Sequence, residues 1–597
     1  MLLSTISVVA GLLSAETPDT IQAVTIVADR GVVVSRTDTV QISNSISITD
    51  AFAAIPGLQV MDNGGPAGLK SVSLRGMGSP HAVIYVDGIR VGNVQSGQAD
   101  LGTFDLGNCG NVVIDYAQNS ISFNTAKPVF GVRPFGGRVK FRGGSFGTYE
   151  PSGRLDFKLS DKVCLSATAS WLFSKGDFPL PDGNRRLNND IRQIHTGLDS
   201  WGIIDGGDWH AKACCNGSRR GTPGTLEWPS TDRQKDLNAF LQGLVREQFS
   251  SLYALHASAK ISFDNMEYLG LQGDNHYSQT EIQLNSAHKF SVRRWFDASL
   301  SAGFCWDGLD SDLYGAARTS LSATASAAFH PDRFKADIAL EYSATFDKGG
   351  RRRNVISPSA DLRWNAFSGF DLLAFARRAY RTPTFNELYY PGYGNPDLKA
   401  EDAWLTGLGM EYSRAYGSNW HLLAKADGFF NYLKDKIISV PTADNPNIWL
   451  PYNVGEVQMT GADIRVSANF TGSFLKGGIT ARYSYQNAID RTPDSHTYGQ
   501  QIPFISKHTV VLGADARYKG WSATINWNRR GGRYDSEGRM PDYNTLDITA
   551  EREIKLPADL ALCLKFIARN LTDCRYELAG GYPMPGIAFY GEINFKF

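Results

Sequence analysis

The chain has 597 residues, with 60 Lys and Arg against 60 Asp and Glu, and a sequence pI of about 7.1. This balance argues against a nucleic-acid-binding protein, which would carry a basic excess. The hydrophobic content of 42% excludes a disordered chain, and no run of about 20 apolar residues predicts a membrane-spanning helix. A β-barrel stays possible, because its strands cross a bilayer with a much weaker signal.

The first fifteen residues have the pattern of a secretory signal peptide. An apolar run from Leu2 ends in Leu13-Ser14-Ala15, a small-x-small cleavage motif, and the chain turns polar at Glu16. The basic residues that usually precede such a run are missing, and a short buried helix or strand is the alternative. We predict a signal peptide over residues 1–15.

The cysteines and histidines suggest neither a metal centre nor an active site. Seven cysteines in 597 residues do not form a disulfide framework, and no Cys/His spacing matches a zinc site. No Ser/His/Asp or paired-carboxylate pattern indicates catalysis. We therefore expect a protein that is not an enzyme and requires no cofactor, and the sequence leaves any metal site unknown.

From about Phe135 to the end of the chain, apolar residues occupy every second position. Such alternation is typical of strands with one apolar and one polar face. Clear examples are residues 163–173, 298–306, 321–329, 464–470 and 587–597. Aromatic residues collect at strand ends, as expected of an interfacial girdle: Trp171, Phe173, Trp295, Phe296 and Phe329. The strands are expected to be about ten residues long, enough to cross a bilayer at a tilt.

The connections between these strands are of two kinds. Residues 329–333 and 367–370 predict short turns, whereas residues 174–224 and 440–453 predict long loops. Short turns on one side and long loops on the other are typical of an outer-membrane barrel. At roughly 20 residues for each strand and its connection, residues 135–597 would form about 22 antiparallel strands, and a barrel of that size needs a plug. We predict an all-β transmembrane barrel over 135–597 and an α+β plug domain over 31–134 inside its lumen.

The predicted plug has one helix and several short strands. Thr49-Asp50 is a candidate cap for a helix that contains Phe52, and Pro56-Gly57 would end it. Residues 72–76 and 82–86 predict strands, and Asp87-Gly88 predicts a hairpin turn.

These plug motifs and several barrel motifs resemble those of the TonB-dependent outer-membrane receptors. In the plug the similar segments are residues 54–58, 72–76 and 84–90. In the barrel they are residues 380–389, 394–401, 453–463 and 570–576, with a terminal Phe597. The resemblance covers nearly the whole chain, and it implies a location in the bacterial outer membrane. It also implies a TonB energy-coupling protein as a partner.

The resemblance also implies a TonB box within residues 16–30. The similar residues are Asp19, Thr20, Ile21, Gln22, Ala23, Val24, Thr25, Ile26 and Val27. A short β-branched segment near a terminus suits strand addition to a partner's sheet edge. The alternative is the first strand of the plug.

One stretch departs from the family pattern. After the Asp87-Gly88 turn the family continues with a strand that ends in Arg-Gly-Pro, but here residues 112–119 contain no arginine. The charged contacts of the plug with the barrel wall cannot be carried over strictly from the family.

The plug resembles most closely that of the cobalamin (vitamin B12) transporters. This resemblance implies that two plug apices contact a corrinoid from the extracellular mouth. The residues are Asn63, Gly64, Gly65, Pro66, Ala67, Gly68 and Leu69 in the first apex, and Asn93, Val94, Gln95, Ser96 and Gly97 in the second. Neutral loops suit the amide-fringed corrin, whereas an anionic ferric siderophore would favour Arg and Lys. An Asn-Gly-Gly-Pro segment is also simply a common turn.

Other functions stay open at this point. The cargo could be a ferric siderophore or haem, the barrel could be a passive porin-like channel, and a soluble propeller is the most distant alternative. His81 is expected to be an ordinary surface residue rather than a metal ligand.

The expectations for calcium and for further partners come from the same family. Its loop carboxylates sometimes bind calcium, but Asp177, Asp182, Asp190, Asp199, Asp205 and Asp208 are spread out, which favours a solvated loop. Expected partners are TonB, outer-membrane lipid and a corrinoid, with no nucleic acid. A surface lipoprotein that captures the ligand first is left open.

Overall fold

The computed structural model describes residues 37–40, 42, 45–271, 273–441, 449–535 and 538–597. The predicted signal peptide (1–15) and the predicted TonB box (Asp19–Val27) lie outside the described residues. Among the described residues, no helix is both long enough and apolar enough to span a membrane.

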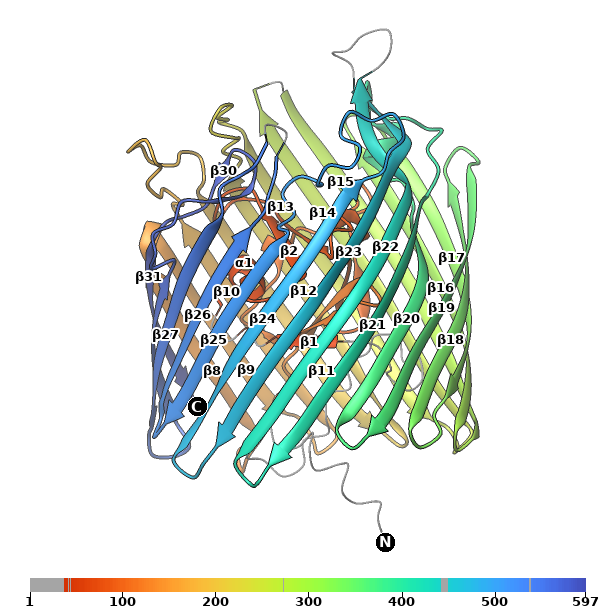
Figure 1. The fold of residues 1–597 in the computed structure, drawn as a ribbon. Helices are drawn as coiled ribbons and strands as arrows, with labels where there is room; N and C mark the ends of the chain where they lie inside the picture. The colour runs from red at the N-terminus through yellow and green to blue at the C-terminus, as the bar shows by residue number, and fades with distance from the viewer. Residues whose placement is uncertain (1–36, 41, 43–44, 272, 442–448, 536–537) are drawn as a thin grey trace.

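Twenty-two strands form one closed antiparallel barrel, which confirms the predicted fold class (Figure 1). The strands are β8 (Phe135–Gly144), β9 (Thr148–Lys158), β10 (Val163–Ser174), β11 (Ile191–Ile204), β12 (Gly207–Gly221), β13 (Arg233–Gln248), β14 (Tyr253–Gly270), β15 (Gly273–Arg293), β16 (Phe296–Ser311), β17 (Ala316–Phe329), β18 (Phe334–Asp347), β19 (Arg352–Phe367), β20 (Phe370–Arg381), β21 (Glu401–Tyr416), β22 (Trp420–Pro441), β23 (Trp449–Thr471), β24 (Leu475–Asp490), β25 (His508–Tyr518), β26 (Trp521–Gly531), β27 (Tyr543–Lys555), β28 (Ala561–Arg569) and β31 (Ala588–Lys596).

The last strand closes the sheet onto the first. β31 pairs with β28 on one side and with β8 on the other. Beyond β31, the amide of Phe597 donates to the carbonyl of Gly137 at 3.0 Å, and the Gly137 amide donates back at 2.8 Å. Closure removes the free sheet edge, which a bilayer would otherwise leave without hydrogen-bond partners.

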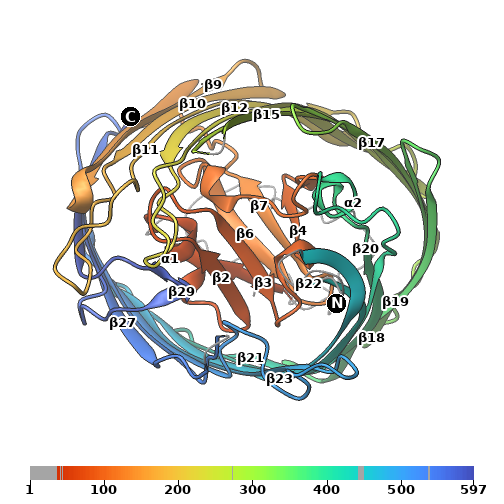
Figure 2. The same cartoon turned by 90° about the horizontal axis from the view of Figure 1, so that it is seen from above.

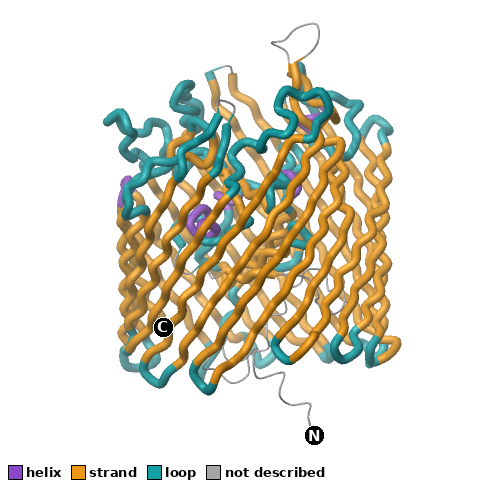
Figure 3. Tube along the Cα trace, in the orientation of Figure 1, coloured by secondary structure: helices purple, strands orange, loops and turns teal. Residues whose placement is uncertain are grey.

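The predicted alternation separates the two faces of the wall. On β13, Leu237 and Leu241 point outward and are exposed, whereas Gln242 is buried on the lumen side. The aromatic girdle is also present, since Trp295 and Phe296 both pack against Phe329 beside two short turns. Figure 3 shows the short turns at one end of the barrel and the longer connections at the other.

Three sequence predictions about strand and loop lengths were wrong. The strands run from 9 residues in β28 to 23 in β23, so most are longer than the ten residues needed to cross a bilayer. Residues 174–224 are not one loop, because they contain β11 and β12, joined at Asp205-Gly206. The outward positions there include Thr196, Cys215 and Gly217, which weaken the apolar alternation. The predicted 440–453 loop is also shorter, since β22 reaches Pro441 and β23 starts at Trp449.

A small α+β domain fills the lumen (Figure 2). A five-stranded sheet has the order β1-β6-β7-β4-β5, and β2 and β3 form a separate hairpin. The elements are β1 (Thr37–Val40), α1 (Ile48–Ala53), β2 (Leu58–Asp62), β3 (Lys70–Leu74), the 3-10 turn η2 (Ser79–His81), β4 (Val83–Val86), β5 (Ile89–Val91), η3 (Leu101–Thr103), β6 (Cys109–Asp115) and β7 (Ser120–Thr125).

The local predictions for this domain mostly hold. Asp87 and Gly88 both have positive φ, 50° and 84°, as a two-residue β4–β5 hairpin requires. The cap of α1 was misassigned, because the Ser47 hydroxyl accepts the Asp50 amide at 3.3 Å. The Thr49 hydroxyl donates instead to Asp62 at 2.7 Å.

Charged pairs join the domain to the wall around its circumference. Removing one partner of a buried pair costs about 3–5 kcal/mol, yet an intact pair adds little net stability. The pairs are Asp38–Arg465 (3.1 Å), Asp50–Arg569 (2.6 Å), Arg75–Asp463 (3.0 Å), His81–Glu401 (2.5 Å), Asp87–Lys212 (3.3 Å) and Asp100–Arg220 (2.7 Å). The domain is thus fixed in register without a large apolar interface.

We predict that Phe52→Ala unfolds the plug locally and leaves the barrel folded. Phe52 is fully buried in the plug core, and such a truncation costs about 3–5 kcal/mol. Hydrogen exchange of β6 should accelerate, while the heat-dependent shift in electrophoretic mobility that marks a folded barrel should persist. Phe135→Ala, on the exposed outer face of β8, serves as the control, and equal exchange in the two variants would contradict the prediction.

Candidate functional site

The two predicted apices lie at the ends of plug hairpins and are covered by barrel loops. Residues 63–69 connect β2 to β3, and residues 93–97 follow β5. Ser96 is exposed, whereas the other residues of both apices are buried or half-buried. The structure thus places the apices beneath other segments of the chain.

The first apex is folded around the ammonium of Lys70. This group donates to the carbonyls of Gly65 and Gly68, both at 2.8 Å, and to that of Pro66 at 3.4 Å. The Asp62 carboxylate accepts the Gly65 amide at 3.1 Å. Because these backbone groups are already paired, the loop is rigid and its one cation faces inward.

The pKa values of two buried carboxylates at this apex, Asp62 and Asp100, are shifted in opposite directions. Burial raises the pKa of Asp62 above its ordinary value, although Lys70 and the bond from Thr49 act in the opposite direction. Burial also raises the pKa of Asp100, but the guanidinium of Arg220 and the ammonium of Lys70 outweigh it and hold that pKa below its usual range. Asp100 is therefore the ionised carboxylate that fixes this edge of the plug to β12.

Two loop segments cover the first apex. The β29 (Glu577–Ala579) and β30 (Tyr582–Pro583) hairpin lies over Gly64, where a Cβ atom would sit 3.3 Å from the Pro583 carbonyl. At Gly65 a Cβ atom would sit 3.1 Å from the Phe178 ring. Both glycines have positive φ, 90° and 94°, so a side chain would be strained by the backbone as well.

The second apex is bonded to a short helix, α2 (Phe385–Tyr389). The amide of Phe385 donates to the Val94 carbonyl at 3.0 Å, and that of Asn386 donates to the Gln95 carbonyl at 3.1 Å. Figure 2 shows α2 inside the barrel mouth, beside the plug. The β20–β21 connection therefore closes directly onto the apex.

Two ion pairs and one histidine–carboxylate contact connect α2 to the plug. Arg381 bridges Glu387 of α2, at 2.9 Å, and Glu401 of β21, at 2.6 Å, and Glu401 contacts His81 at 2.5 Å. His81 was predicted to be a surface residue, which is wrong, since only 5% of its side chain is exposed. A displacement of α2 would therefore be transmitted to η2 of the plug.

Phe385 and Asn386 contact an apex but were not predicted to do so. A usable signal was present, because Thr384-Phe385-Asn386-Glu387 has the T-x-x-E pattern of a capping box, and the structure forms that box. The motif predicts a helix start, although it does not predict which surface the helix covers.

Two groups of possible metal-ligating side chains lie between plug and wall. One contains Asp87, Asp199 and His210, and the other contains Glu281, Cys305 and Asp307. The Lys212 ammonium lies 3.3 Å from Asp87 and 3.0 Å from Asp199, and the Lys260 ammonium lies 2.7 Å from Glu281. In both groups a lysine already supplies the positive charge that a metal ion would bring.

The six aspartates considered for calcium do not share one loop. Asp199 is on β11 and contacts His210, while Asp205 and Asp208 lie at the short-turn end of the barrel. Asp177, Asp182 and Asp190 remain in the loop, where Asp177 pairs with Arg185 and Asp190 with Arg233. The prediction that all six belong to one long loop was therefore wrong.

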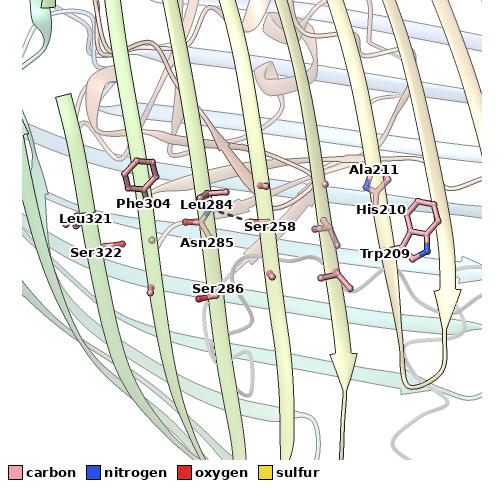
Figure 4. A pocket seen from close by; sticks show the side chains of 17 residues that line it. Trp209, His210, Ala211, Ser258, Leu284, Asn285, Ser286, Phe304, Leu321 and Ser322 are labelled. Carbon is pink, nitrogen blue, oxygen red and sulfur yellow. Dashed lines mark hydrogen bonds between the residues drawn. The ribbon is translucent and has the colours of Figure 1, made fainter. Parts of the chain in front are cut away.

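Two grooves of the described surface lie on the outer wall. One, of about 840 Å³, is bordered by Trp209, Leu284, Phe304 and Leu321, whose side chains stand on the wall strands in Figure 4. The other, of about 810 Å³, lies near the long-loop end of β10–β16. Since both face away from the lumen, neither is a cargo site above the plug.

Comparisons with known proteins agree with this architecture. Residues 24–128 match the TonB-dependent receptor plug domain, and residues 135–562 match the TonB-dependent receptor-like β-barrel. The vitamin B12 transporter BtuB of Vibrio vulnificus is 24% identical over 93% of this chain and 90% of its own length. That of Photobacterium profundum is 23% identical over 92% and 90%.

Solved structures share the fold at lower identity. The FrpB iron transporter of Neisseria meningitidis superposes with a TM-score of 0.77 at 14% identity, covering 95% of this chain and 99% of that one. The Serratia marcescens hemophore receptor HasR gives 0.77 at 14% identity, covering 94% and 99%.

We predict that Lys70→Met loosens the first apex. Each of the three carbonyls left unpaired costs about 1–3 kcal/mol, so the 63–69 amides should exchange roughly tenfold faster or more. Lys162→Met is the matched control, because that ammonium is exposed in a turn at the other end of the barrel. Unchanged exchange at 63–69 in the Lys70 variant would show that the ammonium does not hold the loop.

Proposed function

Since the chain belongs to the family of TonB-dependent receptors, we propose that it imports cobalamin or a related corrinoid across the bacterial outer membrane. The cargo would bind from the extracellular side above the two apices. The TonB protein would supply energy from the periplasmic side. The family is one of transporters and receptors, and no catalytic step is part of the proposal.

The observation that carries the corrinoid proposal is likeness along nearly the whole chain to vitamin B12 transporters. Two such relatives cover at least 92% of this chain, plug and barrel together. The solved structures of iron and haem-related receptors, at 14% identity, bear on the fold alone.

The chemistry of the apices supports the same cargo. The ammonium of Lys70, the cation of the first apex, already donates hydrogen bonds to the loop's own carbonyls. The second apex has no charged residue. Amide and hydroxyl groups of Asn63, Asn93 and Ser96 match a ligand that is fringed with neutral amides. An anionic ferric siderophore would leave its charge without a partner on these apices.

Movement of α2 gives the proposed receptor a way to signal that its cargo has bound. Binding above the second apex would displace α2, and the Arg381–Glu401–His81 chain would transmit that displacement to the plug. The TonB box, proposed at Asp19–Val27, would then be offered to the partner for strand addition. Pulling on this segment would act on a plug held mostly by ion pairs, which add little net stability.

The test is uptake of radiolabelled cyanocobalamin by a strain that lacks its own receptor. The full chain should restore uptake, and a protonophore should abolish it. Replacing residues 19–27 by a Gly-Ser segment of the same length should also abolish it, because that segment lacks β-branched residues. The control, Ile21→Val with Ile26→Val, keeps the β propensity and should keep uptake.

Other outcomes would identify the alternatives. Growth rescue on a ferric siderophore or haem without cobalamin uptake would overturn the corrinoid proposal and retain the receptor. Uptake that survives both the protonophore and the Gly-Ser replacement would indicate a passive porin-like barrel.

A further inference from the structure

The outer wall carries a row of basic side chains across three adjacent strands. Residues that face each other in the sheet are Arg192 of β11, Arg219 of β12 and Lys235 of β13. The row continues to Phe173 on one side and to Glu267 and His276 on the other. Each of the six residues lies one to three residues from the end of its own strand.

These side chains point away from the lumen. Arg192 and Arg219 are exposed, while their strand neighbours Gln193 and Arg220 are buried. The outward residues two positions further along β11 and β13, Ile194 and Leu237, are exposed apolar residues that suit lipid. The row is therefore on the same face as the membrane-contacting residues.

The row places two guanidiniums, those of Arg192 and Arg219, directly opposite each other. Like charges directly opposite each other destabilise a sheet. Lys235 pairs with Glu267 at 2.6 Å, and Arg192 lies over the Phe173 ring at 5.6 Å. Among the described residues, no ion pair within 4 Å involves Arg192 or Arg219, although Asp190 interacts electrostatically with Arg192 and Glu267 with Arg219. Two facing guanidiniums thus leave their donors directed outward.

A groove of about 810 Å³ adjoins the row. Arg192, Arg219 and Lys235 line it, and so do the apolar side chains of Trp171 and Leu237, with Gly217 between them. The other outer groove, shown in Figure 4, is lined by no Lys, Arg, Asp or Glu. Of these two grooves, the one beside the row combines apolar surface with guanidiniums.

Three outward-facing carboxylates of this groove lie at its other side, whereas Asp236 of β13 accepts a hydrogen bond from the Ser218 hydroxyl. Glu267 is paired with Lys235, Asp312 with His276 at 3.1 Å, and Asp310 lies on β16. An anion would therefore be accepted on the β11–β12 side and excluded on the β15–β16 side.

The row lies at a level that matches a lipid headgroup. β10 enters the 175–190 connection and β11 leaves it at Ile191, so Arg192 is close to the long-loop end of the wall, which faces outside in such barrels. Further from this end come Trp171 and Ile194, which face each other on the apolar band.

We propose that Arg192 and Arg219 bind the phosphate group of a lipid in the outer half of the membrane. Guanidiniums form charge-assisted, often bidentate bonds with phosphate. An acyl chain of the same lipid would lie along Trp171, Ile194 and Leu237. The bound phosphate would neutralise the facing cations, and the lipid would become a fixed part of the wall beside the 175–190 loop.

The test is native mass spectrometry of the full chain in detergent, titrated with diphosphoryl lipid A. Arg192→Gln with Arg219→Gln should weaken binding about tenfold or more, the loss expected for charge-assisted bonds. Arg192→Lys with Arg219→Lys keeps the charge and should retain most of the binding. Arg293→Gln with Arg294→Gln removes two exposed charges at the opposite end of the barrel and is the matched control.

The variants are compared only where heat-modified mobility shows a folded barrel. If the Arg→Gln double variant fails to fold, the Arg→Lys double variant is titrated with diphosphoryl lipid A and with lipid A from which both phosphates have been removed. Equal binding of these two lipids would overturn the proposal. Equal loss in the Arg293/Arg294 control would mean general attraction to basic protein, which also overturns it. Saturation by inorganic phosphate alone at micromolar concentration would assign the row to a soluble anion.

Discussion

The hydrogen-bonding needs of the backbone inside a bilayer determine the rest of this structure. Hydrocarbon offers no partner to an N–H or C=O group, so a sheet can cross only when it has no edge. Here the edge is removed by β31, which pairs with β8, and by Phe597, which exchanges two bonds with Gly137. Once 22 strands close in this way, the lumen is wide and polar, and the plug must match a polar wall.

The polar lumen explains why the plug is joined to the wall by ion pairs. An apolar interface of this extent would be stable but hard to part, whereas ion pairs give register with little net stability. The pairs also connect distant parts of the site, since Glu401 contacts both His81 of the plug and Arg381, which holds α2. A receptor that must bind from one side and be opened from the other needs this combination of fixed geometry and modest stability.

The features that could be predicted from the sequence are those with a local signal. Period-two alternation predicts the barrel, and Asp87-Gly88 predicts its hairpin, because each depends on neighbouring residues only. The cover over the apices could not be predicted, since Phe178 and Pro583 are far from Gly64 and Gly65 in sequence. His81 was misjudged for the same reason, as its partner Glu401 is 320 residues away. Loop length was misjudged where small outward residues such as Cys215 and Gly217 interrupt the apolar pattern.

The claim that the two plug apices form the floor of a corrinoid site is tested most directly by a structure of the full chain with cyanocobalamin. The account predicts ligand density in contact with residues 63–69 and 93–97, with α2 displaced from Val94 and Gln95. Density that contacts neither apex, or no bound corrinoid under conditions in which a ferric siderophore or haem binds there, would contradict it.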